Sequence, residues 1–510
     1  MLGLRLFAVG MGLVAGLAVS LHAEAQSARS DRGMLAPEAT ERFLESRPGE
    51  LAWSNDRDYD DLIGAIGRLR DHGLNADHYH LAELVALRGD RTKRDPIATD
   101  AWFSAAAHML FGKLDPVTVE PDWTAAGRKA DLPAHLGRAL DTHTVAGSLE
   151  ALAPRQPGYG RLVETYAGLV ARSGEKPVQV PGGPSLKPGM TDPRVTALQT
   201  RLTQLNLLPA AHVPGVMDAP TVEAVRTFQV GAGLDDDGVA GPATVAALNR
   251  GADDYLNLLR VNMERWRWLP DELGRRHLRV NIAGFDVAVW QDGKIVRTHL
   301  TIVGRLYRKT PVFSDAVRYV VLNPWWETPP SLARIDKLPM FRKDPGAVRR
   351  LGFQVIDSKG ELVDPDAIDW NALTPANFAY RLRQAPGPEN ALGQVKIMFP
   401  NRHNVYLHDT PTRGLFAHRQ RAFSSGCVRT QNPLVLVEWL LNETPGWGAT
   451  EIAEAVAAGK ERRVNLAQPV PVHILYFTAV VEPGGAVRYL DDIYDRDAAV
   501  LRGLREAPGS

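Results

Sequence analysis

The stretch AFSSGCVRTQNP, residues 422–433, contains the only cysteine of the 510-residue chain, Cys427. A cysteine that serves as a small hydrophobe normally lies in an apolar run. Cys427 instead follows two serines and a glycine and precedes Arg429 by two positions. This turn-like setting presents a side chain rather than burying it. Because a single thiol cannot form an internal disulfide, the sequence points to a chemical role for Cys427 or to none.

A cysteine nucleophile needs a base, donors for the oxyanion and a groove that excludes water. The candidate base is His408, upstream in the segment NVYLHDTP. Strand alternation places Tyr406 and His408 on one face and turns Asp409 to the other. Asp409 is therefore a poor candidate for orienting the imidazole, and a backbone carbonyl would serve equally well.

The residues around the thiol supply the other predicted parts. Gly426 lets the backbone approach a scissile carbonyl closely. The amides of Gly426 and Cys427 are predicted donors to the tetrahedral oxyanion. Arg429 is predicted to stabilise the thiolate or to hold a substrate carboxylate.

Chemistry alone leaves two other interpretations of Cys427 open. The thiol could be unreactive or structural, as a lone cysteine often is. A metal site is the other alternative, although no pair among His403, His408 and His418 has the spacing of a helix-borne site, and the cysteine has no thiol partner.

The charge balance and the length of the chain indicate what class of protein this is. Lys plus Arg equals Asp plus Glu at 59 each, so the net charge is zero. This balance gives no basic surplus for a nucleic-acid partner. The length predicts three or four domains.

The N-terminus predicts export. After Arg5 an apolar run leads to Ala23-Glu24-Ala25, the layout of a secretory signal peptide with a cleavage site. The run is short for a membrane-spanning helix. We therefore expect cleavage after Ala25, with an uncleaved anchor as the alternative.

Hydrophobic periodicity predicts an all-helical part followed by a strand-rich part. Helical spacing recurs in DYDDLIGAIGRLRDHGL and YGRLVETYAGLVARSG, and three short helices, the third starting at Pro242, follow the Pro- and Gly-rich linker 178–192. From about residue 276, runs rich in Val, Ile and Tyr predict strands, and a long polar, partly helical insertion between two of them is a lid or decoration. The predicted divisions are a signal peptide (1–25), a helical N-terminal scaffold (30–180), a three-helix domain (186–250), a mostly-β domain (255–480) with an insertion (331–393), and a C-terminal extension with a weakly ordered tail (481–510).

Two segments resemble known families. Residues 186–250, through the runs AVRTFQ and DGVAGPAT, resemble the three-helix peptidoglycan-binding domain. The run VYLHDTPTRGLFAHRQRAFSSGCVRTQNP resembles the active-site signature of L,D-transpeptidases, a histidine followed by Ser-x-Gly-Cys-x-Arg. The runs VVLNPWWETPPS and GPENALGQVKIMFPN are similar to the large periplasmic branch of Gram-negative bacteria. Smaller members of the family commonly have a histidine at the position of Ser425. Ser425 departs from those members but matches the large branch.

The resemblance implies a multidomain α+β enzyme of the periplasm that forms 3→3 cross-links in peptidoglycan. Cys427 would attack the carbonyl of the third residue of a tetrapeptide stem, typically meso-diaminopimelate, and D-alanine would leave. The amine of a second stem would then resolve the thioester, with His408 as base and then acid. Tyr406 would help to hold the oxyanion or the substrate. No cofactor or metal is expected, carbapenems are expected to acylate Cys427, and wall-synthesis proteins are candidate partners.

The same resemblance implies a donor site. Its predicted substrate-binding residues are Trp325, Trp326, Ser425 and Asn323. Packing beneath the lid is the alternative for the two tryptophans, and a turn with Pro324 is the alternative for Asn323. Two rival functions stay open: a thiol carboxypeptidase or endopeptidase that uses water as the acceptor, and a non-catalytic wall-binding scaffold.

Overall fold

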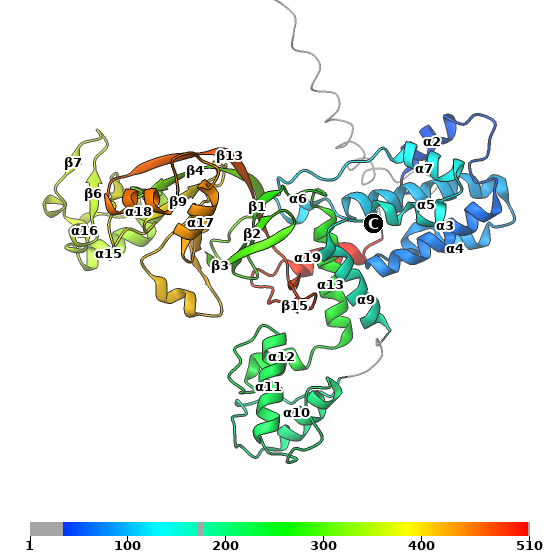
Figure 1. Cartoon of the computed structure of the whole chain (residues 1–510), viewed down its shortest axis with the longest axis horizontal. Coiled ribbons are helices and arrows are strands. Elements are labelled where there is room, and N and C mark those ends of the chain that lie inside the picture. Colours follow the sequence, from blue (N-terminus) through cyan, green and yellow to red (C-terminus); the bar gives the residue numbers. More distant parts are fainter. Residues whose placement is uncertain (1–33, 172–176, 508–510) are drawn as a thin grey trace, which may run out of the picture. The chain divides into compact units, whose positions relative to one another are not determined.

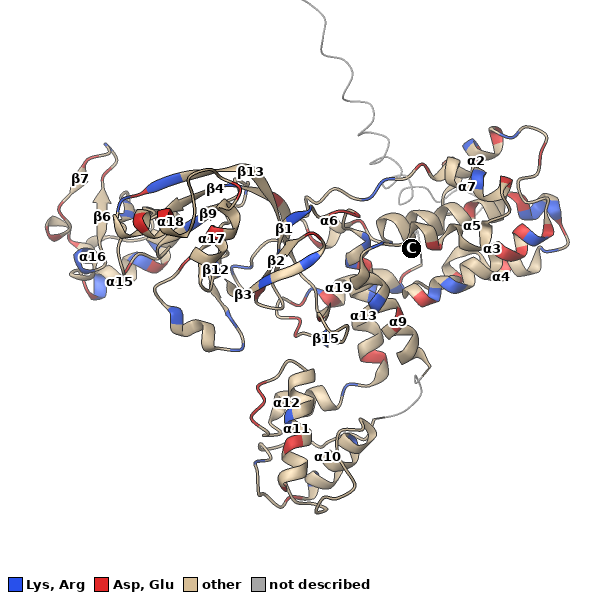
Figure 2. Ribbon diagram, in the orientation of Figure 1, with Lys and Arg blue, Asp and Glu red and all other residues tan. Residues whose placement is uncertain are grey.

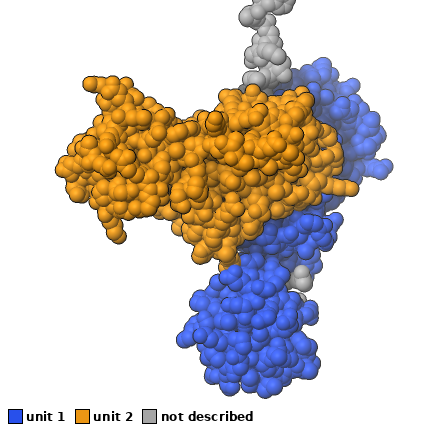
Figure 3. Space-filling view, turned by 60° about the vertical axis from the view of Figure 1, so that its left-hand side comes forward, with its two compact units in different colours: residues 1–271, 477–510 blue, residues 272–476 orange. Residues whose placement is uncertain are grey.

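The computed structural model describes residues 34–171 and 177–507 (Figure 1). The chain forms two compact units, residues 1–271 with 477–510 and residues 272–476 (Figure 3). The predicted signal peptide, residues 1–25, lies outside the described residues. Among the residues that are described, no helix is long and apolar enough to cross a membrane.

The first unit is helical, as predicted. Its helices begin at polar caps: Asn55 accepts hydrogen bonds from Arg57 N and Asp58 N at the start of α3, the arrangement that satisfies free amides of the first turn. Acidic and basic residues are interspersed along these helices (Figure 2). The longer helices are α2 (Pro37–Glu45), α3 (Asp56–Arg68), α5 (Arg91–Phe111), α7 (Leu132–Asp141), α9 (Pro157–Val170) and α13 (Ala252–Arg267), and the shorter ones are α4 (Leu81–Ala86), α6 (Pro116–Val119) and α8 (Val145–Ser148).

Three helices of this unit enclose a separate core: α10 (Pro193–Gln204), α11 (Ala219–Gly231) and α12 (Pro242–Leu248). Pro242 occupies the first position of its helix, as predicted. The interpretation of 178–192 as a linker is wrong for part of that segment. Val180 and Leu186 are buried in the three-helix core, and Leu186 pairs with Ala240 in an isolated bridge. The apolar side chains between the prolines and glycines explain this packing.

The C-terminal segment also differs from the prediction, because it is ordered. It forms the strands β14 (Ala479–Val481) and β15 (Val487–Tyr489) and the helix α19 (Asp497–Arg505), in which Val500 and Leu504 are buried. Arg265 of α13 pairs with Asp497 at 2.6 Å. Helix α13 thus belongs to the first unit, whereas the predicted catalytic domain, residues 255–480, included most of it.

The second unit is built on a nine-stranded sheet in the order β11-β3-β12-β10-β9-β4-β13-β1-β2, and an additional pairing of β2 with β3 closes the sheet on itself. The run KIVRTHLTIVG coincides with β3. Helix α17 (Pro433–Leu441), predicted from PLVLVEWLL, packs on β13 and β9, and α18 (Ala449–Ala457) follows it. The strands are β1 (Arg276–Asn281), β2 (Asp286–Gln291), β3 (Lys294–Gly304), β4 (Phe313–Leu322), β9 (Val395–Met398), β10 (Leu407–His408), β11 (Ala422–Ser424), β12 (Val428–Thr430) and β13 (Arg462–Leu475).

The connection between β4 and β9 is a small subdomain of its own. A four-stranded sheet, in the order β5-β8-β6-β7, and short helices enclose a hydrophobic core that includes Trp326, Phe341, Phe353 and Trp370. The interior of the insertion is therefore hydrophobic, although the sequence predicts a polar insertion. Its elements are β5 (Trp326–Glu327), α14 (Pro330–Leu332), the π-helix η4 (Ala333–Lys337), α15 (Leu338–Lys343), α16 (Ala347–Arg350), β6 (Phe353–Ile356), β7 (Leu362–Val363) and β8 (Arg381–Gln384).

Candidate active site

The sheet register brings the predicted catalytic residues to one face. Strand β10 lies between β9 and β12. It runs parallel to β12, with Leu407 opposite Val428 and His408 opposite Arg429, and Val428 N donates to Tyr406 O at 3.1 Å. Side chains alternate along a strand, so those next to the buried pair Leu407 and Val428 share the opposite face. That face carries Tyr406, His408, Cys427 and Arg429.

Cys427 is half-buried at the start of β12. Its thiol donates a hydrogen bond to the main-chain oxygen of Asn404, with Sγ and O 3.6 Å apart, rather than to the imidazole. Burial raises the pKa of the Cys427 thiol, and hydrogen bonds from Tyr406 and the charges of Lys396 and Arg429 offset this only in part. The resting group is therefore a thiol that needs a base.

His408 is suited to be that base. Its ring is 5% exposed, and burial, followed by the charge of Arg429, lowers the pKa of His408 to about 3. Nδ1 lies 2.5 Å from the main-chain oxygen of Asp409, so the neutral ring carries its proton there and leaves Nε2 free to accept one. This agrees with the expectation that a backbone carbonyl orients the ring. The Asp409 carboxylate instead accepts from Gln394 N at 2.9 Å.

Gly426 turns the chain just before Cys427. Its φ of +118° is a conformation that favours glycine. Its amide donates to Ser424 Oγ at 3.1 Å, so donation to an oxyanion requires this hydrogen bond to break, and that role stays a prediction. The amide of Cys427 donates no hydrogen bond within the described part of the chain, and it stays a candidate oxyanion donor.

Tyr406 lies beside both catalytic groups. Its ring stands edge-on to His408 with the centroids 5.6 Å apart. Burial raises the pKa of Tyr406, and the nearby Cys427 raises it further. The hydroxyl therefore keeps its proton and can donate it to sulfur or to an oxyanion.

Lys396 is a member of the site that sequence reasoning missed. It pairs with His408 in the register of β9 and β10, and its Nζ lies 3.9 Å from the centroid of the Tyr406 ring. The available signal was the alternation in QVKIMFP, where the lysine interrupts an apolar run and faces away from Val395 and Ile397.

Arg429 and Ser425 contact neighbouring loops. Arg429 Nη1 donates to Thr412 Oγ1 at 3.2 Å, and burial lowers the pKa of Arg429. Ser425 is exposed and its Oγ accepts from Arg308 Nη1 at 3.1 Å. Arg308 also forms an ion pair with Asp336 of the insertion at 2.7 Å, and so connects the insertion to the nucleophile loop.

The predicted substrate-binding aromatic residues separate into two environments. Trp326 is 8% exposed within the core of the insertion, so its ring mainly packs. Trp325 is half-buried, its amide donates to Glu461 Oε2 at 2.7 Å, and the guanidinium of Arg383 lies 4.7 Å from its ring centroid.

Asn323 shapes a turn before Pro324, the alternative to its prediction as a substrate contact, which stays a prediction. It adopts a φ of +46° after β4. Its Nδ2 lies within hydrogen-bond distance of three carbonyl oxygens at the end of α18, those of Ala455 (2.9 Å), Val456 (3.1 Å) and Lys460 (3.3 Å). These acceptors occupy the amide.

The alternative metal site is not assembled. His403 packs on Phe313 and His418 on Phe423, away from the environment of His408. Across residues 34–171 and 177–507, no three His, Cys, Asp or Glu residues form a group that could hold a metal ion.

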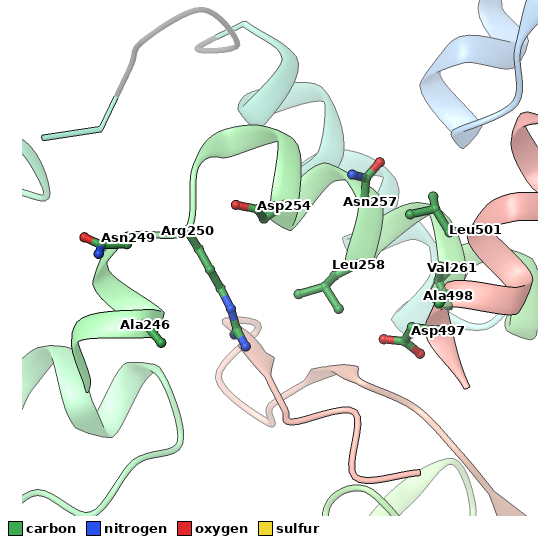
Figure 4. A pocket seen from close by; sticks show the side chains of 10 residues that line it. All are labelled: Ala246, Asn249, Arg250, Asp254, Asn257, Leu258, Val261, Asp497, Ala498 and Leu501. Carbon is green, nitrogen blue, oxygen red and sulfur yellow. The ribbon is translucent and has the colours of Figure 1, made fainter. Parts of the chain in front are cut away.

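A cavity of about 380 Å³ lies in the first unit, between the end of α12, α13 and α19 (Figure 4). Its lining includes Arg250, Asn257 and Asp497 but no cysteine or histidine. It is therefore separate from the candidate active site.

Comparison with known families agrees with this geometry. Residues 275–461 match the L,D-transpeptidase catalytic domain, residues 38–165 a scaffold domain, and residues 191–248 a candidate peptidoglycan binding domain. A Haemophilus influenzae protein named as a candidate L,D-transpeptidase is 37% identical over 242 residues, which are 48% of this chain and 48% of that protein. The chain thus spans about half the length of this curated relative.

Two solved L,D-transpeptidases are more distant. The structure from Xylanimonas cellulosilytica is 18% identical, with a TM-score of 0.19, and covers 58% of this chain and 99% of its own. The structure from Stackebrandtia nassauensis is 13% identical, with a TM-score of 0.21, and covers 59% of this chain and 97% of its own. At these TM-scores the two likenesses support no inference.

The α+β architecture is consistent with the match of residues 275–461 of the second unit to the L,D-transpeptidase catalytic domain. This chain therefore carries one region that matches the L,D-transpeptidase catalytic domain and another that matches a candidate peptidoglycan-binding domain.

Proposed function

We propose that the chain forms 3→3 cross-links in peptidoglycan through a thioester on Cys427. The observation that carries the proposal is the shared face of Tyr406, His408 and Cys427, with Nδ1 of His408 against Asp409 O and burial lowering the pKa of His408. A neutral base next to a protonated thiol is the arrangement that acyl transfer by cysteine requires.

The acylation step follows from this geometry. The thiol turns from Asn404 O toward His408, whose Nε2 takes the proton as Sγ bonds to the carbonyl carbon of the third stem residue. The amide of Cys427 and the hydroxyl of Tyr406 stabilise the oxyanion. His408 then returns the proton to the departing amine of D-alanine, and the carbon–nitrogen bond breaks to leave a thioester.

The second half-reaction reverses these roles. The amine of a second stem attacks the thioester carbonyl, His408 accepts its proton, and the carbon–sulfur bond breaks to restore the thiol. The insertion between β4 and β9 favours this amine over water if it covers the bound donor.

We further propose that residues 186–250 hold the enzyme on the wall, that the five divisions expected from the sequence are its functional parts, and that it works in the periplasm.

Intact-mass measurement tests the nucleophile. The wild-type protein incubated with a carbapenem is expected to gain the mass of one drug molecule, and the Cys427→Ala variant is expected to gain none. An unmodified wild-type protein, or a variant that still gains mass, contradicts the proposal.

Muropeptide analysis by mass spectrometry tests the reaction. Purified tetrapeptide muropeptides are expected to yield 3→3 dimers and free D-alanine. Shortened stems without dimers would show that water is the acceptor, and so would identify a carboxypeptidase.

A further inference from the structure

Two lysine ammonium groups near the candidate site form no ion pair with a described residue. Lys396 Nζ stands 3.9 Å from the ring centroid of Tyr406, and Lys337 Nζ stands 5.3 Å from that of Trp326. Both side chains are half-buried. Within the described residues neither ammonium forms a hydrogen bond or an ion pair.

The acidic groups in the vicinity are already engaged. Asp336 pairs with Arg308 at 2.7 Å. Glu461 accepts from Trp325 N at 2.7 Å, and Asp409 accepts from Gln394 N at 2.9 Å. Asp336 acts on Lys337, and Glu461 on Lys396, only as more distant charges that do not offset the effect of burial.

The two lysines belong to one site although they come from different parts of the unit. Lys396 lies on β9 of the large sheet, opposite His408. Lys337 ends the π-helix η4 of the insertion, and a π-turn frequently marks a functional position. Tyr406 packs against the core that contains Trp326, so the rings under the two ammonium groups are neighbours.

Keeping the ammonium groups of Lys337 and Lys396 half-buried without an ion pair costs free energy. Burial lowers the pKa of Lys337 and of Lys396, which means that solvent is partly withdrawn from each charge. Such a free-energy cost is commonly retained in a binding site, because the charge of an anionic ligand offsets it.

We propose that Lys337 and Lys396 bind the carboxylates that flank the scissile bond, so that the enzyme selects donor stems whose carboxylates are free rather than amidated. This inference rests on the proposed function for the identity of the ligand. A tetrapeptide stem carries one carboxylate on the diaminopimelate side chain and one on the terminal D-alanine. Ammonium groups on aromatic faces attract such anions without competing intramolecular partners.

Binding to the Cys427→Ala protein tests this without catalysis. Three synthetic tetrapeptide stems are titrated by calorimetry: one with free carboxylates, one amidated on diaminopimelate, and one ending in D-alaninamide. Amidation of a recognised carboxylate is expected to weaken binding by about tenfold or more. Lys337→Gln and Lys396→Gln are each expected to abolish the loss caused by one of the two amidations.

A matched control and three contrary results make the test decisive. Lys343→Gln removes an exposed lysine of α15 in the same insertion and is expected to leave all three affinities unchanged. The proposal is overturned if the three stems bind the parent protein equally, or if each lysine variant weakens all three by the same factor. It is also overturned for Lys396 if Lys396→Gln shifts only the pH dependence of Cys427 alkylation.

The outcomes separate this inference from the proposed function. A wild-type protein that prefers free carboxylates but forms no thioester would refute the function and keep the inference. A protein that forms the thioester without any preference would refute the inference and keep the function.

Discussion

At the scale of single residues, the protonation state of the His408 imidazole decides whether it can act as a base. Burial of the His408 ring, together with the nearby cations Arg429 and Lys396, favours the neutral ring over the imidazolium, and the hydrogen bond from Nδ1 to Asp409 O opposes this only in part. The same cations favour the thiolate of Cys427. Burial outweighs this effect, so the resting pair is a neutral thiol and a neutral imidazole, and the lysine and arginine favour the thiolate once His408 has taken the proton.

His408→Ala tests the base directly. We expect the rate of carbapenem acylation of Cys427 to fall by about a hundredfold or more, the usual effect of losing a general base. His418→Ala, which removes an exposed ring that packs on Phe423, is the matched control and should keep the wild-type rate. Stopped-flow fluorescence or timed mass spectrometry gives the rates. A wild-type rate in His408→Ala would remove this residue from the mechanism.

The pH dependence of the thiol follows from its burial. Since burial raises the pKa of Cys427, we expect the alkylation rate with iodoacetamide to keep rising above pH 8. An imidazolium–thiolate pair would instead give a plateau across pH 5–8. A rate that is flat over that range would contradict the neutral pair described here.

At the scale of elements, Asn323 joins the end of β4 to the end of α18. Its left-handed backbone turns the chain, and its amide caps carbonyl oxygens of that helix. The residue therefore holds two elements together.

Asn323→Gly isolates the amide, because glycine also accepts a positive φ. We expect a loss of about 1–3 kcal/mol in the free energy of unfolding, the cost of unsatisfied buried carbonyl groups, with little change in the carbapenem acylation rate. Chemical denaturation and acylation kinetics measure the two effects. A large loss of acylation at unchanged stability would support the substrate-binding role predicted for Asn323.

At the scale of the whole molecule, buried histidines make the catalytic unit sensitive to acid. Burial lowers the pKa of His277 to about 4 and that of His408 to about 3, and it also lowers the pKa of His299 and His473. Their folded pKa values lie below the unfolded value, so the unfolded chain binds more protons between pH 6.5 and about 4. Stability is therefore unaffected above pH 6.5 and decreases as the pH falls through this window.

Thermal unfolding of the full chain at pH 7.5 and pH 4.5 measures this effect. We expect a lower melting temperature at pH 4.5, with His277 alone contributing up to about 3 kcal/mol. The His277→Phe variant keeps a ring against Trp290 and should show a shallower dependence on pH. Equal melting temperatures at both pH values would contradict the neutral, buried state of these rings.

The local sequence determined the kinds of element and the chemical groups of the site. The β-branched residues of KIVRTHLTIVG, the proline at the start of α12 and the apolar run of α17 are all read within a few residues. The signature around Cys427 and His408 is equally local. Such patterns depend on the periodicity of the backbone, which a single segment carries by itself.

Tertiary structure alone decided which groups meet. The position of β10 between β9 and β12 sets Lys396 beside Tyr406, and the turn before β12 directs the amide of Gly426 to Ser424. The folded core likewise took up Val180 and Leu186, and α19 became ordered against α13. Pairing of distant strands and burial of short apolar segments depend on the rest of the chain, because the free energy comes from contacts that no local pattern contains.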